Sequence, residues 1–423
     1  MNKTLLFSRP MRKAYILVFS TVCVLNFTTS GQLTQNNSSQ TSTWQLNTIT
    51  TAVPFLQITP DSRSGAMGDA GVALPADANA TFWGPAKLSF SKEKSEVSFS
   101  YSPWLRALVN DMSLAYLSGY KKVSKNQAIG ASLRYFTLGN ITFTDEVGTN
   151  IMDFKPNEFA IDACFGQKFS ESFSGGIAIR YIYSNLTGGQ TVLGADSKPG
   201  MAIASDISLF YSKENISLGK KGGIFNVGMS ATNIGNKIRY TNSDKRDFIP
   251  ANLRLGTYLG AQLDKYNLLG FTVDFNKLLV PSPPKYSADG EKIIAGKDNN
   301  VGVATAIVQS FTDAPGQLDD NNQVIAGSVL REELREINIA SGFEYWYDKQ
   351  FAFRTGYFYE HFSKGNRQFI TLGAGLKYQV LTIDMSYLIS TTQQNPLANT
   401  LRFTMRFTLG AKKITEEETP SSD

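Results

Sequence analysis

The sequence predicts an all-β protein, a fourteen-stranded antiparallel transmembrane β-barrel with an N-terminal hatch that plugs it. Apolar and polar residues alternate with a period of two from about residue 96 onward, as in strands that have one apolar face. The alternating segments number about fourteen, and an even number is typical of bacterial outer-membrane barrels. Tight turns and long loops tend to alternate between these segments. This arrangement places the turns on one rim of a barrel and the loops on the other.

The last segment shows the alternation most clearly. Leu401, Phe403 and Met405 share one face, and Arg402 and Thr404 share the other. The predicted strands span residues 96–102, 111–122, 126–138, 156–170, 172–184, 199–213, 224–235, 249–264, 266–277, 333–348, 350–362, 367–378, 380–391 and 397–409.

Charged residues recur on the polar face of the predicted strands. On the lipid face each would cost about 2–4 kcal/mol at the bilayer midplane, so they are expected to point into the lumen. A soluble β-sandwich is the alternative, but its turns would not sort by rim. The charged residues expected inside the barrel are Arg134, Arg180, Asp206, Arg254, Asp274, Glu344, Arg354 and Asp384.

The two ends of the chain are predicted to lie outside the barrel, which comprises residues 96–410. Residues 1–31 combine a basic start with an apolar run over 14–27, which is typical of a cleaved export signal and short for a bilayer span. Residues 32–52 are expected to be a linker, and the charged residues 411–423 a periplasmic tail. The export signal and the strands together predict an outer-membrane location. The formal net charge is only +5, much of it in the export signal, which argues against nucleic acid as a partner.

Few residues are suited to catalysis or to metal binding. His361 is the single histidine, and Cys23 and Cys164 are the only cysteines, which excludes multi-histidine metal sites and a disulfide framework. We therefore expect no cofactor and no enzymatic activity. His361 itself is predicted to point outward from the strand over residues 350–362, among interfacial aromatic residues.

Residues 53–95 do not alternate and are interpreted as a lumenal or periplasmic hatch. Glycines at 65, 68 and 71 allow close backbone packing, and Asp77 or Asn79 is expected to cap a short helix. A barrel of this width is too wide for its own side chains to fill, which favours a plug over a periplasmic linker. The candidate hatch residues are Asp61, Arg63, Gly68, Asp69, Gly71, Asp77, Asn79, Trp83 and Pro85.

The loop over residues 278–332 is the second candidate site. Apolar residues recur there at helical spacing after a possible capping segment, residues 298–300, and a second amphipathic piece is expected around residues 324–334. So long a loop is uncommon without a function. It is interpreted either as a lid on the barrel mouth or as a surface for a partner, and both roles are compatible. The residues at helical spacing are Val301, Ala304, Ile307, Val308 and Phe311.

Two parts of the sequence resemble the PorV/PorQ family and, more widely, the FadL-type barrels. One is the hatch, which reads PDSRSGAMGDAG over 60–71 and continues through DAN at 77–79 to WGPAK at 83–87. The other is SFTDAPG at 310–316 with REELREI at 331–337, separated here by an extra stretch over 317–330. Gly84 stands where the family usually has Asn.

The resemblance implies an outer-membrane component of the type IX secretion system of Bacteroidetes. Its implied partners are the large translocon barrel, cargo proteins with a C-terminal signal domain, the surface attachment complex with its sortase-like PorU, and outer-membrane lipid. The resemblance also leaves two alternatives open. One is a FadL-type transporter of hydrophobic small molecules, and the other is lipid A deacylation, for which His361 would be the candidate residue.

Overall fold

The computed structural model describes most of the chain after residue 45. The described residues are 46–105, 111–144, 147–192, 195–218, 222–242, 246–287, 289–319, 321–392, 397 and 399–410. The chain divides into two units, residues 1–42 and residues 43–423, and every described element belongs to the second. The predicted export signal and C-terminal tail lie outside the described residues.

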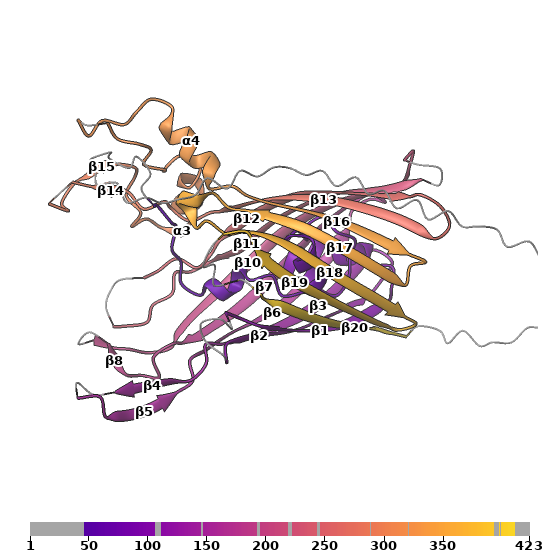
Figure 1. Cartoon of the computed structure of the whole chain (residues 1–423), viewed down its shortest axis with the longest axis horizontal. Coiled ribbons are helices and arrows are strands. Elements are labelled where there is room, and N and C mark those ends of the chain that lie inside the picture. Colours follow the sequence, from indigo (N-terminus) through magenta and orange to yellow (C-terminus); the bar gives the residue numbers. More distant parts are fainter. Residues whose placement is uncertain are drawn as a thin grey trace, which may run out of the picture. The chain divides into compact units, whose positions relative to one another are not determined.

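Fourteen antiparallel strands form a closed barrel in which the last strand pairs with the first (Figure 1). This confirms the predicted fold class and strand number. The barrel strands, in spatial order, are β1 Ser95–Pro103, β2 Ser113–Lys122, β3 Gln127–Thr137, β6 Asn157–Lys168, β7 Phe173–Asn185, β10 Gly200–Ile216, β11 Gly223–Gly235, β12 Asn252–Gln262, β13 Asn267–Leu278, β16 Asn338–Tyr347, β17 Phe351–Tyr359, β18 Gln368–Tyr378, β19 Leu381–Ser390 and β20 Leu401–Leu409.

The alternation of the sequence becomes an apolar outer wall and a polar lumen. On β20, for example, Phe403 and Met405 are exposed on the outside, and Arg402 and Thr404 are buried inside. All eight charged residues that the sequence assigned to the lumen are buried. Because lipid can solvate an apolar wall and cannot solvate these charges, the barrel is built to lie in a membrane.

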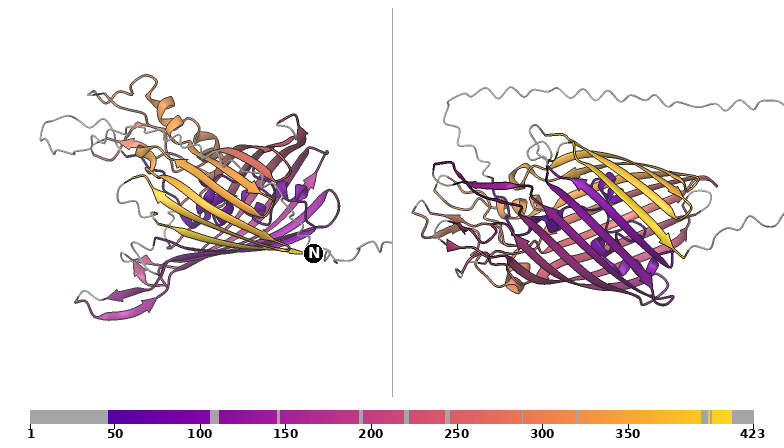
Figure 2. Two further views of the ribbon diagram at one scale, coloured as in Figure 1. Left: turned by 45° about the vertical axis from the view of Figure 1, so that its right-hand side comes forward. Right: turned by 90° about the horizontal axis from the view of Figure 1, so that it is seen from below.

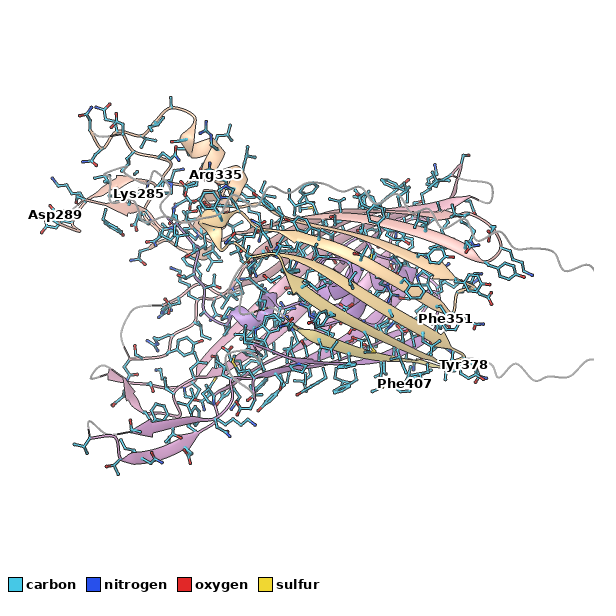
Figure 3. The ribbon with its side chains drawn as sticks, viewed as in Figure 1. Lys285, Asp289, Arg335, Phe351, Tyr378 and Phe407 are labelled. Atoms are coloured by element: carbon cyan, nitrogen blue, oxygen red, sulfur yellow. The ribbon has the colours of Figure 1, made fainter. Side chains whose placement is uncertain are left out.

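The connections differ sharply between the two rims, as Figure 2 shows. One rim, here called the turn rim, has the tight turns that join β2 to β3, β6 to β7, β12 to β13, β16 to β17 and β18 to β19. It also has exposed aromatic residues near strand ends, among them Phe351, Tyr378 and Phe407 (Figure 3).

The opposite rim, the loop rim, has the long connections. It includes three small hairpins, formed by β4 Ile141–Thr144 with β5 Asn150–Phe154, β8 Thr191–Val192 with β9 Ala195–Asp196, and β14 Lys285–Tyr286 with β15 Ile293–Ala295. The longest connection joins β13 to β16 over residues 279–337 and is called the lid. It contains α3, Val303–Gln309, and α4, Ser328–Arg335.

Several strands begin or end a few residues away from the predicted positions, and two of these differences affect the candidate residues. The expected strand over 333–348 begins only at Asn338, because α4 continues to Arg335. The expected strand over 350–362 ends at Tyr359. Beyond it His361 caps the short 3-10 helix η3, Phe362–Lys364, and accepts a hydrogen bond from the Ser363 backbone N–H at Nδ1. His361 is therefore part of a loop and not of the outward-facing barrel wall.

The segment before β1 runs through the barrel interior (Figures 1 and 2). It consists of η1 Pro54–Gln57, α1 Ser62–Ala66, α2 Ala80–Trp83 and η2 Pro85–Phe90. Helix α1 packs on β17 to β20, and η2 packs on β2, β3, β6, β7 and β10. Residues 53–94 are called the hatch below. Among the described residues, no helix has the length and hydropathy needed to cross a bilayer.

Candidate functional site

An alternating chain of charges fixes the hatch to the barrel wall. Arg63 of α1 donates from Nε and Nη2 to both carboxylate oxygens of Glu344 on β16, at 3.0 and 2.9 Å. Arg354 of β17 donates to the same Glu344 at 2.6 Å and to Asp384 of β19 at 2.7 Å. Arg406 of β20 links Asp384 back to the hatch, at 3.2 Å from its carboxylate and 3.3 Å from that of Asp77. Charges that would be costly alone in the lumen neutralise one another in this network.

A second ion network holds the other side of the barrel. Asp162 on β6 lies between Arg134 and Arg180, and Arg180 also reaches Asp206 on β10 at 2.8 Å. Arg134 donates to the backbone carbonyl of Leu56 in the hatch at 3.1 Å. The hatch is therefore held from both sides of the barrel.

The hatch also has an internal frame. Asp61 caps α1 by accepting from the Ser64 backbone N–H at 2.8 Å, and its other oxygen accepts from the Trp83 indole N–H, also at 2.8 Å. Trp83 packs edge-on against Phe82, with 4.9 Å between ring centroids. One carboxylate thus joins the first hatch helix to the second.

Two of the predicted glycines allow close approach. Gly68 has a positive φ of 72°, and a Cβ there would lie 2.6 Å from the Tyr357 carbonyl and 2.7 Å from that of Ser341. At Gly71 a Cβ would overlap the Trp83 ring. Backbone packs directly on backbone at Gly68, which only glycine permits.

The other predicted hatch residues also make buried contacts. Asp69 accepts from Arg402 at 2.8 Å, and the Gly71 N–H donates to Asp274 at 2.6 Å. Asn79 is buried at the start of α2, where it makes no capping bond. Pro85 begins η2, and its carbonyl occupies the space that a Cβ at Gly166 would need. All nine predicted hatch residues therefore converge within the lumen.

A cluster of ion pairs fastens the lid to the barrel mouth. Glu336 accepts from Lys277 at the end of β13 at 2.7 Å and from Lys364 of η3 at 2.9 Å. On α4, Glu333 accepts from Lys277 at 3.1 Å, and Glu332 accepts from Lys364 at 2.8 Å. These five residues are called the lid ion cluster. Because both lysines belong to the barrel or its nearest loop, the cluster determines where the lid lies.

Apolar side chains remain exposed on the lid. On α3 and just after it, Val308 is 74% exposed and Phe311 is 48% exposed. On α4, Leu330 and Leu334 are 66% and 60% exposed, four residues apart on one face. Ala306 is the buried residue of α3, so this helix packs through a small side chain and turns larger ones outward.

The family profile described as "Type IX secretion system protein PorV" matches residues 40–285, more than half of the chain. The chain belongs to the PorV family. No curated protein sequence matches it. The protein is thus an outer-membrane barrel of a family named for type IX secretion, in agreement with the resemblance seen in its sequence.

Solved structures similar in fold include those of two toluene transporters and a FadL homologue. The Ralstonia pickettii toluene transporter TbuX has a TM-score of 0.45 and 11% identity, over 83% of this chain and 98% of its own. The Pseudomonas putida toluene transporter TodX has a TM-score of 0.44 and 11% identity, over 86% and 98%. A Pseudomonas aeruginosa FadL homologue has a TM-score of 0.41 and 12% identity, over 83% and 99%.

The predicted lid residues do not all share one environment. Ala304, Val308 and Phe311 are exposed, whereas Val301 and Ile307 are half-buried. Helix α3 begins later than expected, at Val303. Its N-cap is Gly302, so the side chains of residues 298–300 do not cap it.

The lid ion cluster was not predicted from the sequence. No single-sequence signal connects Lys277, Lys364 and the α4 carboxylates, because their pairing depends on where two separate loops meet. Within the described part of the chain, no group of three or more His, Cys, Asp or Glu side chains is placed to hold a metal ion.

We expect the lid to loosen as pH rises through the titration of Asp313. Burial raises the pKa of this carboxyl to about 6, and the negative charges of Glu333 and Glu336 add to the rise. Since the folded-state pKa lies above the unfolded value, protonated Asp313 favours the packed lid. That contribution is lost between about pH 4 and pH 6, and ionisation costs on the order of 2 kcal/mol above that range.

Asp313→Asn should therefore protect the lid at pH 7, because the amide oxygen can still accept from the Ser282 N–H. Hydrogen exchange of α4 should be at least tenfold slower than in the unchanged protein at pH 7, and similar at pH 4. Asp289→Asn, at the exposed tip of the β14–β15 hairpin, is the matched control and should leave α4 unaffected. Equal exchange in Asp313→Asn and the unchanged protein at pH 7 would show that this carboxyl does not strain the lid.

Proposed function

We propose that this protein is a docking component of type IX secretion, which binds the C-terminal signal domain of cargo proteins at the translocon and delivers them to the surface attachment complex with PorU. Membership of the PorV family supports the secretion system as its setting. In this proposal the loop rim faces outward from the cell and the turn rim faces the periplasm, as in other outer-membrane barrels with short periplasmic turns.

The filled lumen is the observation that most strongly favours docking over conduction. The hatch crosses the interior and is held there by buried ion pairs with β16 and β20 and, on the other side, by the hydrogen bond from Arg134 of β3 to the Leu56 carbonyl. Moving it aside would break pairs whose loss leaves uncompensated buried charge, at a cost of about 3–5 kcal/mol each. A folded cargo domain is therefore expected to pass beside this barrel, on its outer surface.

The exposed apolar residues of the lid are the proposed docking surface. Val308 and Phe311 have the size and exposure of interface anchors, and Phe311 lies over Lys277 of the lid ion cluster, with Nζ 5.8 Å from the ring centroid. The cluster would hold these anchors at a fixed position relative to the membrane.

The combined change Val308→Ser and Phe311→Ser should weaken recovery of partners. Each buried apolar side chain contributes about 1.5–3 kcal/mol, so the loss corresponds to tenfold or more in affinity. The measurement is an affinity pull-down of the tagged protein from its own outer membrane in mild detergent, with the translocon barrel and cargo proteins quantified by mass spectrometry.

The matched control is Val147→Ser with Ile151→Ser. These residues lie in and beside the β4–β5 hairpin and are 86% and 61% exposed, so the control removes similar apolar surface from a different loop. Equal recovery in the lid variant and its control would rule out the lid as the dock.

A FadL-type transporter of hydrophobic small molecules remains the alternative function. Hatch side chains, among them Phe82 and Trp83, occupy the lumen that an apolar ligand would have to cross, which does not favour transport. Copurification of fatty acids, with no translocon and no cargo, would support transport and contradict the docking proposal.

Lipid A deacylation has less support. The Nδ1 atom of His361 lies 2.9 Å from Ser363 Oγ, but it also accepts the Ser363 N–H as a helix cap, and Ser363 is buried. This geometry accounts for His361 as a structural residue of η3.

A further inference from the structure

The start of the described chain lies at the loop rim, and residues 46–52 are called the strap. The Asn47 backbone N–H donates to the Ser363 carbonyl in the β17–β18 loop at 2.9 Å. Its side-chain amide donates to the Pro283 carbonyl at 3.3 Å and to Glu332 of α4 at 3.1 Å. At the other end of the strap, the Ala52 N–H donates to the Phe248 carbonyl in the β11–β12 loop at 2.9 Å.

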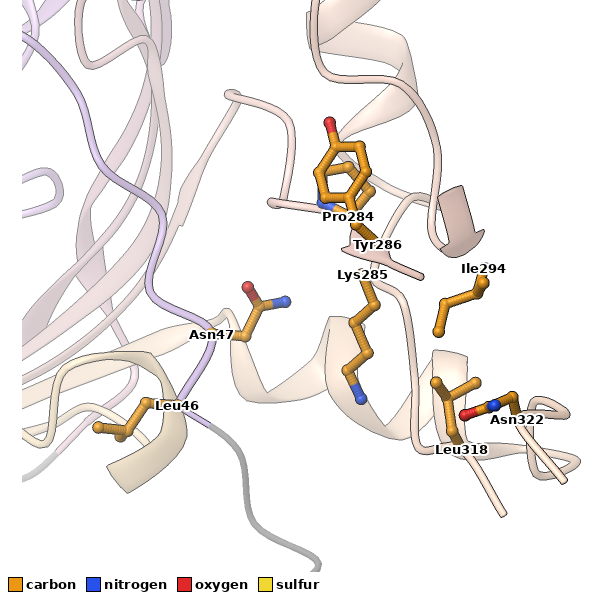
Figure 4. Close-up of a pocket in the computed structure, with 8 residues that line it drawn as sticks. All are labelled: Leu46, Asn47, Pro284, Lys285, Tyr286, Ile294, Leu318 and Asn322. Carbon is orange, nitrogen blue, oxygen red and sulfur yellow. The ribbon is translucent and has the colours of Figure 1, made fainter. Parts of the chain in front are cut away.

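The lid and the strap enclose a cleft of about 470 Å³ (Figure 4). In the figure, Leu46 and Asn47 lie on the strap, and the remaining lining residues project from the lid across from them. These are Pro284, Lys285, Tyr286, Ile294, Leu318 and Asn322. The strap is therefore a contact element of the lid.

The chain reaches the opposite rim once it has passed through the lumen. Lys168 near the turn-rim end of β6 lies over the Phe90 ring, with Nζ 4.0 Å from the centroid. The Lys94 carbonyl then accepts from the Lys122 N–H, and β1 starts at Ser95 beside Leu409 of β20. The hatch thus crosses the barrel once, from loop rim to turn rim.

We infer that the chain enters the barrel from the outer face of the membrane and leaves it, after β20, on the periplasmic face. Leu46 and Asn47 of the strap then lie at the cell surface beside the lid, on the surface that a partner meets. The assignment of the loop rim to the outside rests on the proposed function, whereas the crossing of the hatch rests on the contacts above.

Cysteine labelling on intact cells tests this inference. In a Cys164→Ser background, Leu46→Cys reports on the strap, which is 74% exposed at this residue. Glu291→Cys reports on the lid hairpin, and Lys125→Cys reports on the exposed β2–β3 turn. We expect a membrane-impermeant maleimide to label Leu46→Cys and Glu291→Cys in intact cells, and Lys125→Cys only after the outer membrane is permeabilised.

Two other results would overturn different parts of the inference. Labelling of Leu46→Cys only together with Lys125→Cys, after permeabilisation, would contradict the direction in which the hatch crosses the lumen. Labelling of Lys125→Cys alone in intact cells would reverse the orientation on which the proposed function depends. Folding of each variant is checked by its heat-dependent mobility in SDS gels.

Discussion

Glu344→Gln should destabilise the protein by about 3–5 kcal/mol, the largest effect that we expect from a single polar substitution. Glu344 is 1% exposed and is the shared partner of Arg63 in the hatch and Arg354 in the wall. Glutamine keeps the size of the side chain and removes its charge. Two buried guanidinium groups would then lose their common counter-ion, and the hatch would lose its bidentate contact with β16.

We expect a clear drop in the unfolding temperature of the detergent-solubilised barrel. Tryptophan fluorescence measures this temperature. Glu214→Gln is the control, because its ion pair with Lys92 is long, at 3.8 Å, with side chains 60% and 85% exposed. The same chemical change there should cost about 0–1 kcal/mol. Similar shifts in both variants would mean that the lumenal network does not stabilise the fold.

Gly68→Ala should displace the hatch from its position against β16 and β17. The Gly68 N–H donates to the Thr371 side chain at 3.0 Å, and a methyl group would meet the main chain of both β16 and β17. Strand backbone within a closed barrel cannot yield as a flexible side chain can. The positive φ adds a further cost of about 1–2 kcal/mol for any residue with a Cβ.

Limited proteolysis of native outer membranes measures the effect, since a displaced hatch exposes residues 53–94 to cleavage. Gly290→Ala separates the two causes. Gly290 has a similar φ of 77°, but a Cβ there would meet nothing within 4 Å. Increased hatch cleavage is expected in Gly68→Ala only. If both variants are cleaved alike, the close approach at Gly68 does not help to hold the hatch in place.

The strands could be predicted because the residue pattern of each strand depends on its own surroundings, lipid on one face and the lumen on the other. The alternation of apolar and polar residues shows which side chains face lipid and which face the lumen. It can be recognised in each strand without knowing which distant residues the strand contacts. This is why Arg354 and Asp384 could be assigned to the lumen from sequence. The hatch partner of Glu344 could not be assigned, because Arg63 and Glu344 are separated by 281 residues and meet only once the barrel has closed.

The same distinction explains the errors at the lid. The helical spacing predicted α3 and a second amphipathic piece around 324–334, but the strand was predicted to start at 333. Helix α4 continues to Arg335, and β16 begins only at Asn338. Glu333 and Glu336 fell within the predicted strand over 333–348, yet both are buried against lysines from two other elements. The strap was likewise expected to be a linker, since its bonds to three loops depend on tertiary structure alone.

The seam between β1 and β20 couples closure of the barrel to the position of the hatch. Thr404 on the last strand accepts from the backbone of Ser62 and shares a hydrogen bond with Ser100 on the first, across separations of 342 and 304 residues. The same strand edge that closes the wall therefore also holds the hatch, and contacts this distant in sequence form slowly. A substitution in β20 that weakens the seam is expected to loosen the hatch as well, because Thr404 serves both.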